Sequence, residues 1–336
     1  MQRPPSQPSE LSDLIAALQE SVSILHKQDI QTAATTLGQW VPGADDARIQ
    51  LGDDCAAIPD GDGYLLLAAE GMWPQLVTQD PWFAGWCAVM VNLSDIAAMG
   101  GSAIAIVDAL WSQSPETSQP VWEGMRAAAS AYGVPIVGGH TNCHSPHDGL
   151  AVAVMGRSQE LITSFDVEPG HALAMVVNLE GAAYYKDYPF WNAATTADPT
   201  VLREQLALLP LLAKSGLCPS GKDISMGGLA GTLLMLCEAS GVGAVLDLDR
   251  VPRPSAEIWK EIGWKKWLTS FPSFGFLLSL PPENLETVTA LFEPHGLTCQ
   301  EIGTVTARPE VMMSQGDRKE LFWDLAQPLT GFGVRQ

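Results

Sequence analysis

The clearest pattern of apolar and polar positions lies between Asp80 and Gly101, where large apolar side chains recur every three or four residues. These side chains are Trp82, Trp86, Val89, Leu93 and Ile96. Their spacing predicts a helix over residues 81–99 with one face in the core. Asp80 can cap this helix, Pro81 suits its first position and Gly100 can end it. The neighbouring face is small or polar and would let a ligand approach closely; it consists of Gly85, Ala88, Asn92 and Asp95.

The same reasoning places the other elements of the first half of the chain. Amphipathic spacing predicts a helix over residues 11–28. The remaining predicted elements are strands at 47–51, 64–69, 103–110, 135–137 and 150–155 and a helix at 120–132. This order of strands and helices is typical of an α+β sandwich with helices on one face of a mixed sheet. We expect the strand at 103–110 to be buried.

A polar stretch at residues 160–170, which ends in Pro169 and Gly170, is the predicted boundary between two domains. Beyond it, we predict strands at 171–178, 244–248, 275–280 and 301–305 and helices at 200–215, 226–240 and 282–295. The predicted organisation is a disordered tail (1–10), a helix and linker (11–44), an N-terminal domain (45–160) and a C-terminal α/β domain (170–336). The aromatic segment 184–192 is a candidate lid or acceptor loop, or a surface loop packed on another subunit.

Composition excludes some partners. The chain of 336 residues has 18 basic and 38 acidic side chains, a formal net charge of −20, which argues against nucleic acid and anionic membranes. No Lys or Arg occurs from Ile49 to Met125, so a phosphate ligand bound there needs divalent cations. Six scattered cysteines and the absence of a long apolar run predict a cytoplasmic protein without a membrane span.

Acidic residues lie near the ends of several predicted elements. Asp53 and Asp54 follow the first strand, Glu70 follows the second, and Asp95 lies on the polar face of the helix at 81–99. Adjacent carboxylates repel each other unless a cation lies between them. An ordinary Asp-rich turn is the alternative for residues 52–54 alone. Four carboxylates from three elements predict a site for two Mg²⁺ ions that bridge phosphates.

A second polar segment begins at Gly138-Gly139, where two glycines permit close approach of a ligand to the backbone. His140 follows directly and is the candidate that we single out. The residues of this segment that can bind a transition metal are His140, Cys143, His144, His147 and Asp148. Because their spacing matches no standard zinc pattern, a solvated polar loop is the alternative.

A third candidate, residues 222–229, joins a strand to the helix at 226–240. Ser225 can cap this helix, and Gly227 and Gly228 expose backbone N–H groups at its positive end. Such an end favours anions. Close helix packing uses the same residue types, and we expect Met226 to pack in the core.

Taken together, these motifs resemble the AIR synthase-related (PurM-like) superfamily, which includes thiamine-monophosphate kinase and selenophosphate synthetase. The matching segments are Gly52-Asp-Asp-Cys-Ala-Ala57, Asn92-Leu-Ser-Asp-Ile-Ala-Ala-Met-Gly100, Val137-Gly-Gly-His-Thr141, Lys222-Asp-Ile-Ser-Met-Gly-Gly-Leu229, Phe274-Gly-Phe-Leu-Leu-Ser and Glu301-Ile-Gly-Thr-Val305. They follow the family order over about residues 45–307.

The resemblance implies a two-domain α/β fold with mixed sheets, which dimerises through its N-terminal sheets. It also implies that the γ-phosphate of ATP is transferred to a small acceptor with Mg²⁺. The implied metal ligands are Asp53, Asp54, Glu70, Asp95 and Asp223. The implied nucleotide contacts are Asn92, Gly138, Gly139, Thr141, Lys222, Gly227 and Gly228. Asp95, Asp53 and His140 are the candidate catalytic residues.

The chain also departs from these relatives. His140, Met226 and Glu70 stand where thiamine-monophosphate kinases have Asp, and residues 1–46 lack the cysteine of selenophosphate synthetases. We therefore interpret the chain as a divergent member whose acceptor the motifs do not name. An ATP-dependent enzyme is the first hypothesis, a non-catalytic nucleotide-binding platform for partner enzymes the second, and a transition-metal protein the third.

Overall fold

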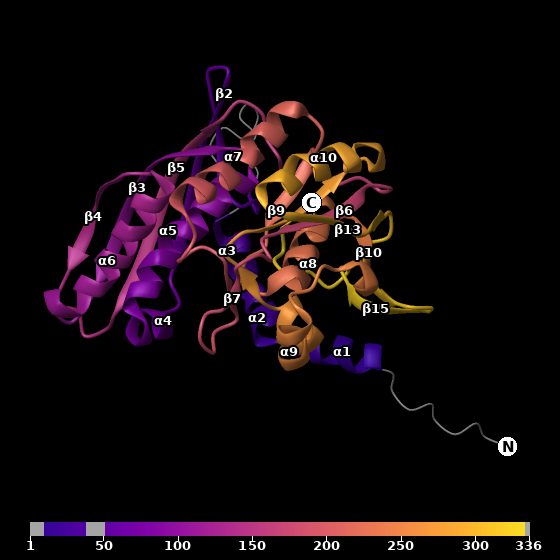
Figure 1. Ribbon diagram of the computed structural model, residues 1–336, viewed down its shortest axis with the longest axis horizontal. Coiled ribbons are helices and arrows are strands. Elements are labelled where there is room, and N and C mark those ends of the chain that lie inside the picture. Colours follow the sequence, from indigo (N-terminus) through magenta and orange to yellow (C-terminus); the bar gives the residue numbers. More distant parts are fainter. Residues whose placement is uncertain (1–9, 38–50, 333–336) are drawn as a thin grey trace.

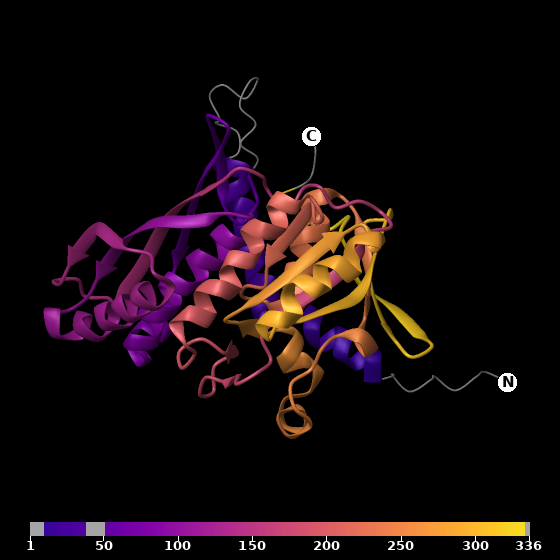
Figure 2. The same ribbon diagram turned by 45° about the horizontal axis from the view of Figure 1, so that its top comes forward.

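The computed structural model describes residues 10–37 and 51–332 (Figure 1). The predicted tail at 1–10 and strand at 47–51 therefore lie almost wholly outside the described residues. Two mixed sheets lie side by side, one built from each half of the chain (Figures 1 and 2). The predicted two-sheet α/β architecture is confirmed.

The first sheet has five strands in the order β1-β2-β5-β3-β4, with β3 and β4 parallel and the other neighbours antiparallel. The strands are β1 (Ala56–Asp60), β2 (Gly63–Gly71), β3 (Ser102–Trp111), β4 (Ile136–Asn142) and β5 (Gly149–Ser158). Their inner side chains form one core with α4 (Pro74–Gln79), α5 (Pro81–Ala98) and α6 (Pro115–Tyr132). Helices thus cover one face of this sheet, as predicted.

The other face of the five-stranded sheet is open in the single chain. Its exposed apolar side chains are Leu67, Ile104, Val107, Val137 and Met155. The strand predicted at 103–110 is therefore buried on one face only, because its alternate side chains point away from the helices. An exposed apolar face of this extent indicates an interaction surface.

Helix α5 follows the predicted boundaries but differs in two details. Gly100 has the left-handed φ of +73° expected after a helix end. Asp80 occupies the N-cap position without capping, because its carboxylate binds Lys186. The small face packs on α6 rather than facing a ligand at Gly85, where an added Cβ would lie 2.1 Å from the Val121 carbonyl oxygen.

The second sheet has seven strands in the order β15-β14-β10-β13-β6-β12-β9. They are β6 (Ala172–Val177), β9 (Ser220–Asp223), β10 (Gly243–Asp247), β12 (Gly275–Leu280), β13 (Thr298–Thr306), β14 (Glu310–Gln315) and β15 (Arg318–Asp324). One face packs on α7 (Pro199–Ser215) and α10 (Leu285–Phe292), and the other on α8 (Gly228–Ser240) and α1 (Glu10–Gln19). The strands at 171–178, 244–248, 275–280 and 301–305 are confirmed, and β9 is the strand expected at the start of residues 222–229, whereas β14 and β15 were not predicted.

A small third sheet joins the two halves. Its strands are β7 (Ala183–Tyr184), β8 (Phe190–Asn192) and β11 (Phe271–Pro272). The aromatic segment that contains β7 and β8 packs on α5 of the same chain, where Tyr185 stacks on Phe83 with ring centroids 3.6 Å apart. Helix α9 (Ala256–Leu268) completes the described elements of this half.

The N-terminal segment is not the single helix predicted over 11–28. Helix α1 ends at Gln19, and α2 (Val22–Leu25), η1 (His26–Gln28) and α3 (Asp29–Leu37) follow. Leu18 and Ile24 both pack in the core around α8, which requires a turn between them. Ser21 makes this turn with an extended ψ of 120°. The turn carries the following residues toward the junction of the two large sheets.

Three other predicted elements change their limits. Helix α6 begins five residues before the predicted start, because Ser114 forms a capping box with Thr117. Strand β4 continues through the segment predicted as a loop, so Gly138, Gly139, His140 and Thr141 are strand residues. The helix predicted at 282–295 is α10 with short 3₁₀ turns, η3 (Pro282–Asn284) and η4 (Glu293–His295), at its ends.

Candidate functional site

Three carboxylates meet where the two large sheets adjoin. Asp54 precedes β1, Asp95 lies in the last turn of α5, and Asp223 ends β9. One carboxylate oxygen from each lies within 4.8 Å of the other two, and this is the one group of its kind among residues 10–37 and 51–332. Of the five predicted metal ligands, Asp54, Asp95 and Asp223 converge here, whereas Asp53 and Glu70 lie outside this group.

Among these three residues, Asp95 has a buried carboxylate oxygen that forms no hydrogen bond. Its side chain is 6% exposed, and its Oδ2 has no hydrogen-bond partner in the structure. Burial raises the pKa of Asp95 well above its usual range, and the nearby carboxylates of Asp223 and Glu70 raise it further. A buried acceptor without a donor is costly unless a cation or a proton satisfies it.

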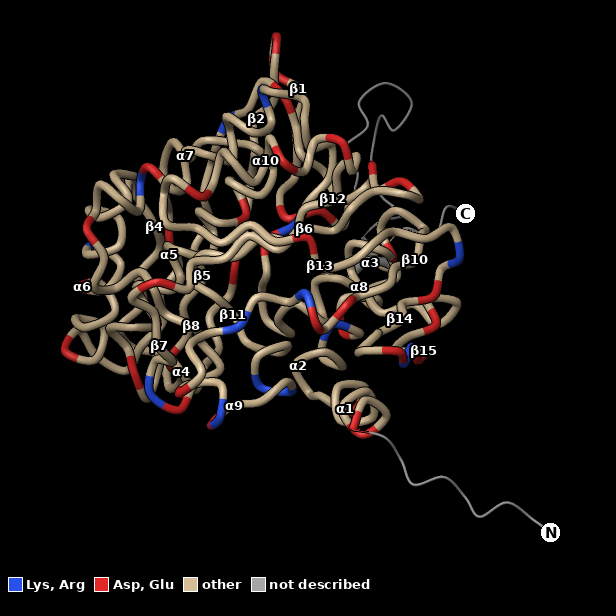
Figure 3. Tube along the Cα trace, turned by 45° about the vertical axis from the view of Figure 1, so that its right-hand side comes forward, with Lys and Arg blue, Asp and Glu red and all other residues tan. Residues whose placement is uncertain are grey.

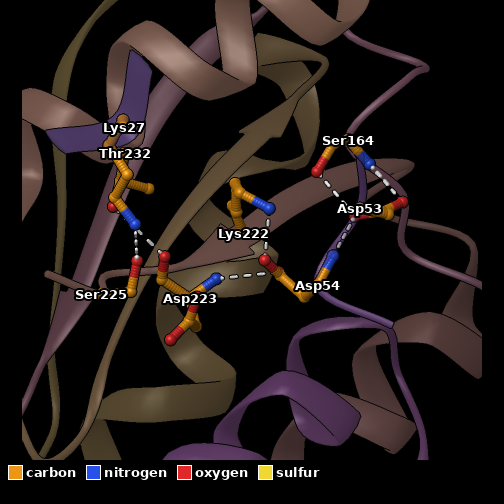
Figure 4. Close-up of polar contacts among 8 residues, drawn as sticks. All are labelled: Lys27, Asp53, Asp54, Ser164, Lys222, Asp223, Ser225 and Thr232. Atoms are coloured by element: carbon orange, nitrogen blue, oxygen red, sulfur yellow. Dashed lines mark hydrogen bonds and ion pairs between the residues drawn. The ribbon is translucent and has the colours of Figure 1, made fainter. Parts of the chain in front are cut away.

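Asp223 has a similar environment. Burial raises its pKa well above the usual range, and the charge of Asp54 raises it further. The Asp223 backbone N–H donates a 3.2 Å hydrogen bond to Asp54 Oδ2 (Figure 4). The two residues are therefore fixed relative to each other by a contact between the two halves of the chain.

Lys222 neutralises part of this acidic group. Its ammonium forms a buried ion pair with the Asp54 carboxylate, with side chains only 7% and 4% exposed (Figure 4). Burial lowers the pKa of Lys222, but the Asp54 and Asp53 carboxylates outweigh burial and the net shift is upward. Lys222 therefore stays charged and is engaged with protein, although the resemblance implied a nucleotide contact.

Asp53 is directed away from the three converging carboxylates. It accepts hydrogen bonds from Ser164 Oγ at 2.6 Å and from the Ser164 backbone N–H at 2.9 Å (Figure 4). Burial raises the pKa of Asp53 to about 6. Asp53 thus fixes the segment that precedes β6, and although it lines the small cavity beside the acidic group, it is not one of the three converging carboxylates.

Lys27 is the residue that sequence reasoning missed. The turn at Ser21 brings its ammonium to 3.4 Å from Ser225 Oγ, beside the acidic group (Figure 4). Burial lowers the pKa of Lys27, while Asp223 and Glu70 oppose this shift. The signal for the turn was Ser21 itself, a residue type that often begins a helix. Because β1, β2, α4, α5 and β3 carry no Lys or Arg, Lys27 and Lys222 supply the positive charge here (Figure 3).

The glycines at the start of α8 have left-handed backbones, with φ of +99° at Gly227 and +63° at Gly228. Ser225 does not cap the helix, since Gly227 occupies the N-cap position. Met226 is 41% exposed and lines a cavity, so its predicted place in the core is wrong. An added Cβ at Gly228 would lie 2.4 Å from the Leu268 carbonyl oxygen, so close packing also explains this glycine.

Asn92 lies one turn before Asp95 and is fully buried. Its Nδ2 donates to the Ala88 carbonyl oxygen at 2.8 Å, and its Oδ1 has no partner in the structure. Asn92 is not among the residues that line the cavities beside the acidic group. The nucleotide contact implied for Asn92 therefore stays a prediction.

The segment from Gly138 to Thr141 is not part of this acidic group in one chain. Strand β4 is the edge of the five-stranded sheet, and none of its residues lines the acidic cavities (Figure 1). Gly139 has a packing reason, because a Cβ there would lie 2.2 Å from Asp108 Oδ1. His140, Cys143, His144 and His147 form no metal-ligand group among the described residues. The hypothesis of a transition-metal centre there is therefore not supported.

Two cavities adjoin the acidic group. One of about 150 Å³ is lined by Lys27, Thr330 and Phe332 in addition to the acidic residues. The other, of about 550 Å³, is lined mainly by apolar side chains. Lys27, Glu70, Asp95, Asp223 and Ser225 line both cavities. The acidic residues thus face a small polar space on one side and a larger apolar space on the other.

Two adjoining mixed sheets with three converging carboxylates at their junction define a two-part α/β protein with a candidate cation site. Comparisons then give the family: models of the N-terminal and C-terminal domains of AIR synthase related proteins match residues 52–158 and 168–314. An uncharacterised protein of Synechocystis sp. is 53% identical over 323 residues, 96% of this chain and 98% of that relative. The chain belongs to the AIR synthase-related family, which confirms the resemblance.

More distant relatives share the fold. Thiamine-monophosphate kinase of Synechococcus elongatus is 29% identical over 299 residues, 81% of this chain and 88% of that protein. The structure of T. maritima PurL complexed with AMPPCP matches with a TM-score of 0.72 at 18% identity. This match covers 97% of the chain but only 52% of PurL, so the chain spans about half the length of that protein.

Proposed function

We propose that this protein is a Mg²⁺-requiring, ATP-dependent enzyme that transfers the γ-phosphate to an oxygen of a small-molecule acceptor. The observation that carries the proposal is the convergence of Asp54, Asp95 and Asp223, with a buried Asp95 oxygen that lacks a partner. Carboxylate oxygens are the ligands that Mg²⁺ prefers. The kinase relative and the nucleotide in the PurL structure support the assignment.

The residues of this chain fit the roles that such a transfer needs. Asp54, Asp95 and Asp223 would hold Mg²⁺, which neutralises phosphate charge when bound. The Lys222–Asp54 ion pair joins the two halves of the chain, and Asp53 fixes the segment between them through Ser164. Lys27 adds a positive charge next to the same space.

Phosphoryl transfer requires no covalent intermediate with the protein. The acceptor oxygen forms a bond to the γ-phosphorus as the bond from phosphorus to the bridging oxygen breaks, and ADP leaves with that electron pair. When the acceptor is a hydroxyl group, its proton needs a base. Glu70 lines both cavities; the residue is exposed, and partial desolvation of its carboxylate raises its pKa. Glu70 is therefore the base that we assign, since a carboxylate with a raised pKa accepts a proton more readily.

Calorimetric titration tests this proposal directly. A non-hydrolysable ATP analogue should bind the wild-type protein with Mg²⁺ and bind at least about tenfold more weakly with EDTA, because the carboxylates then repel the phosphates. Asp62→Asn is the control, since this carboxylate is exposed in the turn between β1 and β2. Equal affinity with Mg²⁺ and with EDTA would contradict the proposal.

A non-catalytic nucleotide-binding platform is the alternative. It is favoured by Met226 and His140, which stand where the resemblance to thiamine-monophosphate kinases implies carboxylates. The two functions differ in turnover. Release of ADP that depends on an added acceptor would exclude the platform, whereas binding without release under every acceptor mixture would favour it.

We also propose a homodimer that forms through the open face of the five-stranded sheet. Val107→Arg places a charge among exposed apolar side chains and should shift the mass in light scattering from twice 35.9 kDa to 35.9 kDa. Leu321→Arg is the control, because Leu321 is similarly exposed but lies on β15. A wild-type monomer would contradict the proposed dimer.

No helix in the described part of the chain is long and apolar enough to cross a membrane. The six cysteines form no disulfide, and five of them are buried. Free thiols support a reducing compartment, and we propose the cytoplasm.

A further inference from the structure

The larger cavity beside the acidic group has the size of a small-molecule site. Its volume of about 550 Å³ lies within the range of about 300–1,000 Å³ that is common for ligand pockets. Its polar end is formed by Glu70, Asp95 and Asp223, where phosphate transfer is proposed. A molecule in this cavity would therefore present one end to the transferring group.

The walls of this cavity are mainly apolar and come from several segments that lie far apart in the sequence. Val22 of α2, Trp73 before α4, Phe190 of β8 and Phe271 of β11 line it together. Trp73 and Met226 are 43% and 41% exposed, so both apolar side chains are accessible to a molecule in this cavity. The cavity is thus built to bury an apolar or aromatic body.

In the absence of a bound cation, the charges around the cavity disfavour an anionic body. The described lining contains three carboxylates and no arginine, and its basic residues are His26 and Lys27. Lys27 already contacts Ser225 and lies in the field of Asp223 and Glu70. A phosphate monoester carries about −1.5 to −2 charges at neutral pH and needs several donors. This lining offers few donors and repels it.

We propose that the cavity binds the phosphoryl acceptor, and that this acceptor is an uncharged, largely apolar or aromatic molecule with a nucleophilic oxygen at one end. The role of that oxygen rests on the proposed phosphoryl transfer. The preference of the cavity for an uncharged molecule over an anion does not depend on that transfer. The oxygen lies at the end formed by Asp95 and Asp223, and the apolar body lies against Trp73 and Phe190.

A pair of matched probes tests the selectivity without nucleotide or metal. 1-Naphthol has an aromatic body and a hydroxyl group, and 1-naphthyl phosphate has the same body with a phosphate ester. Fluorescence titration should show binding of 1-naphthol and at least tenfold weaker binding of 1-naphthyl phosphate. Trp73→Ala and, as a second variant, Met226→Ala should each weaken 1-naphthol binding at least threefold, because each removes an exposed wall.

Trp323→Ala is the matched control, since Trp323 lies on β15 outside this cavity, and it should bind 1-naphthol as the wild type does. Equal binding of both probes, or 1-naphthol binding that neither wall variant weakens, would overturn the inference. A protein that binds the Mg²⁺-nucleotide but not 1-naphthol would overturn this inference alone. A protein that binds 1-naphthol selectively but no nucleotide would support the cavity assignment and refute the proposed phosphoryl transfer.

Discussion

Asp95→Asn is expected to abolish Mg²⁺-dependent nucleotide binding while making the metal-free protein more stable. Removing one of three charged ligands from a compact cation site should lower nucleotide affinity in Mg²⁺ by about 100-fold or more. The asparagine keeps the size of the side chain. Its new amide group can donate to the Asp54 or Asp223 carboxylate, whose oxygens lie within 4.8 Å of that of Asp95. The variant therefore removes electrostatic repulsion among the three carboxylates. This repulsion destabilises the metal-free wild-type protein, which keeps the three charges in order to bind Mg²⁺.

The pH dependence of stability gives an independent check on this variant. Burial raises the pKa of Asp95 well above the value of about 3.9 expected in the unfolded chain. The folded state thus holds the proton more tightly, so stability is present at low pH and is lost as the pH rises from about 4 through the raised folded pKa. Asp95→Asn should flatten this loss.

Thermal unfolding with EDTA, measured from pH 5 to pH 8, and calorimetry with Mg²⁺ together test the prediction. The wild type should lose stability from pH 5 to pH 8 and regain it when Mg²⁺ is added at pH 8. The variant should lose less stability over this pH range and gain less from Mg²⁺. A variant that is less stable than the wild type without metal, or that still binds the nucleotide with wild-type affinity, would show that Asp95 has a different role.

The sequence predicted those parts of the site that local patterns determine. The periodicity around Asp95 specified helix α5, and Gly100 correctly marked its end. The glycines at 227 and 228 correctly marked the start of α8. In each case, backbone conformation or apolar spacing within a few residues decides the structure, so a single chain segment carries the information.

The rest of the site depends on contacts between segments far apart in the chain. Asp53 and Asp54 are adjacent and look equivalent, yet Ser164 binds the first and Lys222 the second. Lys27 reaches the site because Ile24 packs beside α8, more than 200 residues away in the sequence. Gly138-Gly139 looks like a ligand loop but extends an edge strand. The neighbouring residues in the sequence do not determine which of these long-range contacts each side chain or segment makes.

The second large effect is expected for Lys222→Met, which should destabilise the protein by about 3 to 5 kcal/mol. The Lys222–Asp54 pair is buried and joins the seven-stranded sheet to the loop before β1. Loss of the ammonium leaves Asp54 without its counter-ion and increases the repulsion among the remaining carboxylates. Methionine fills a similar volume, so the loss reports charge rather than a cavity.

The double variant Asp54→Asn/Lys222→Met separates charge from packing, because neither partner is then left charged and alone. It should recover much of the stability that Lys222→Met loses, measured as the midpoint of urea unfolding with EDTA, although it should not bind the Mg²⁺-nucleotide. If Lys222→Met alone unfolds at the wild-type midpoint, the ion pair does not hold the two halves together. If instead the double variant is as unstable as the single one, the methylene stem of Lys222 and its packing, rather than its charge, account for the loss.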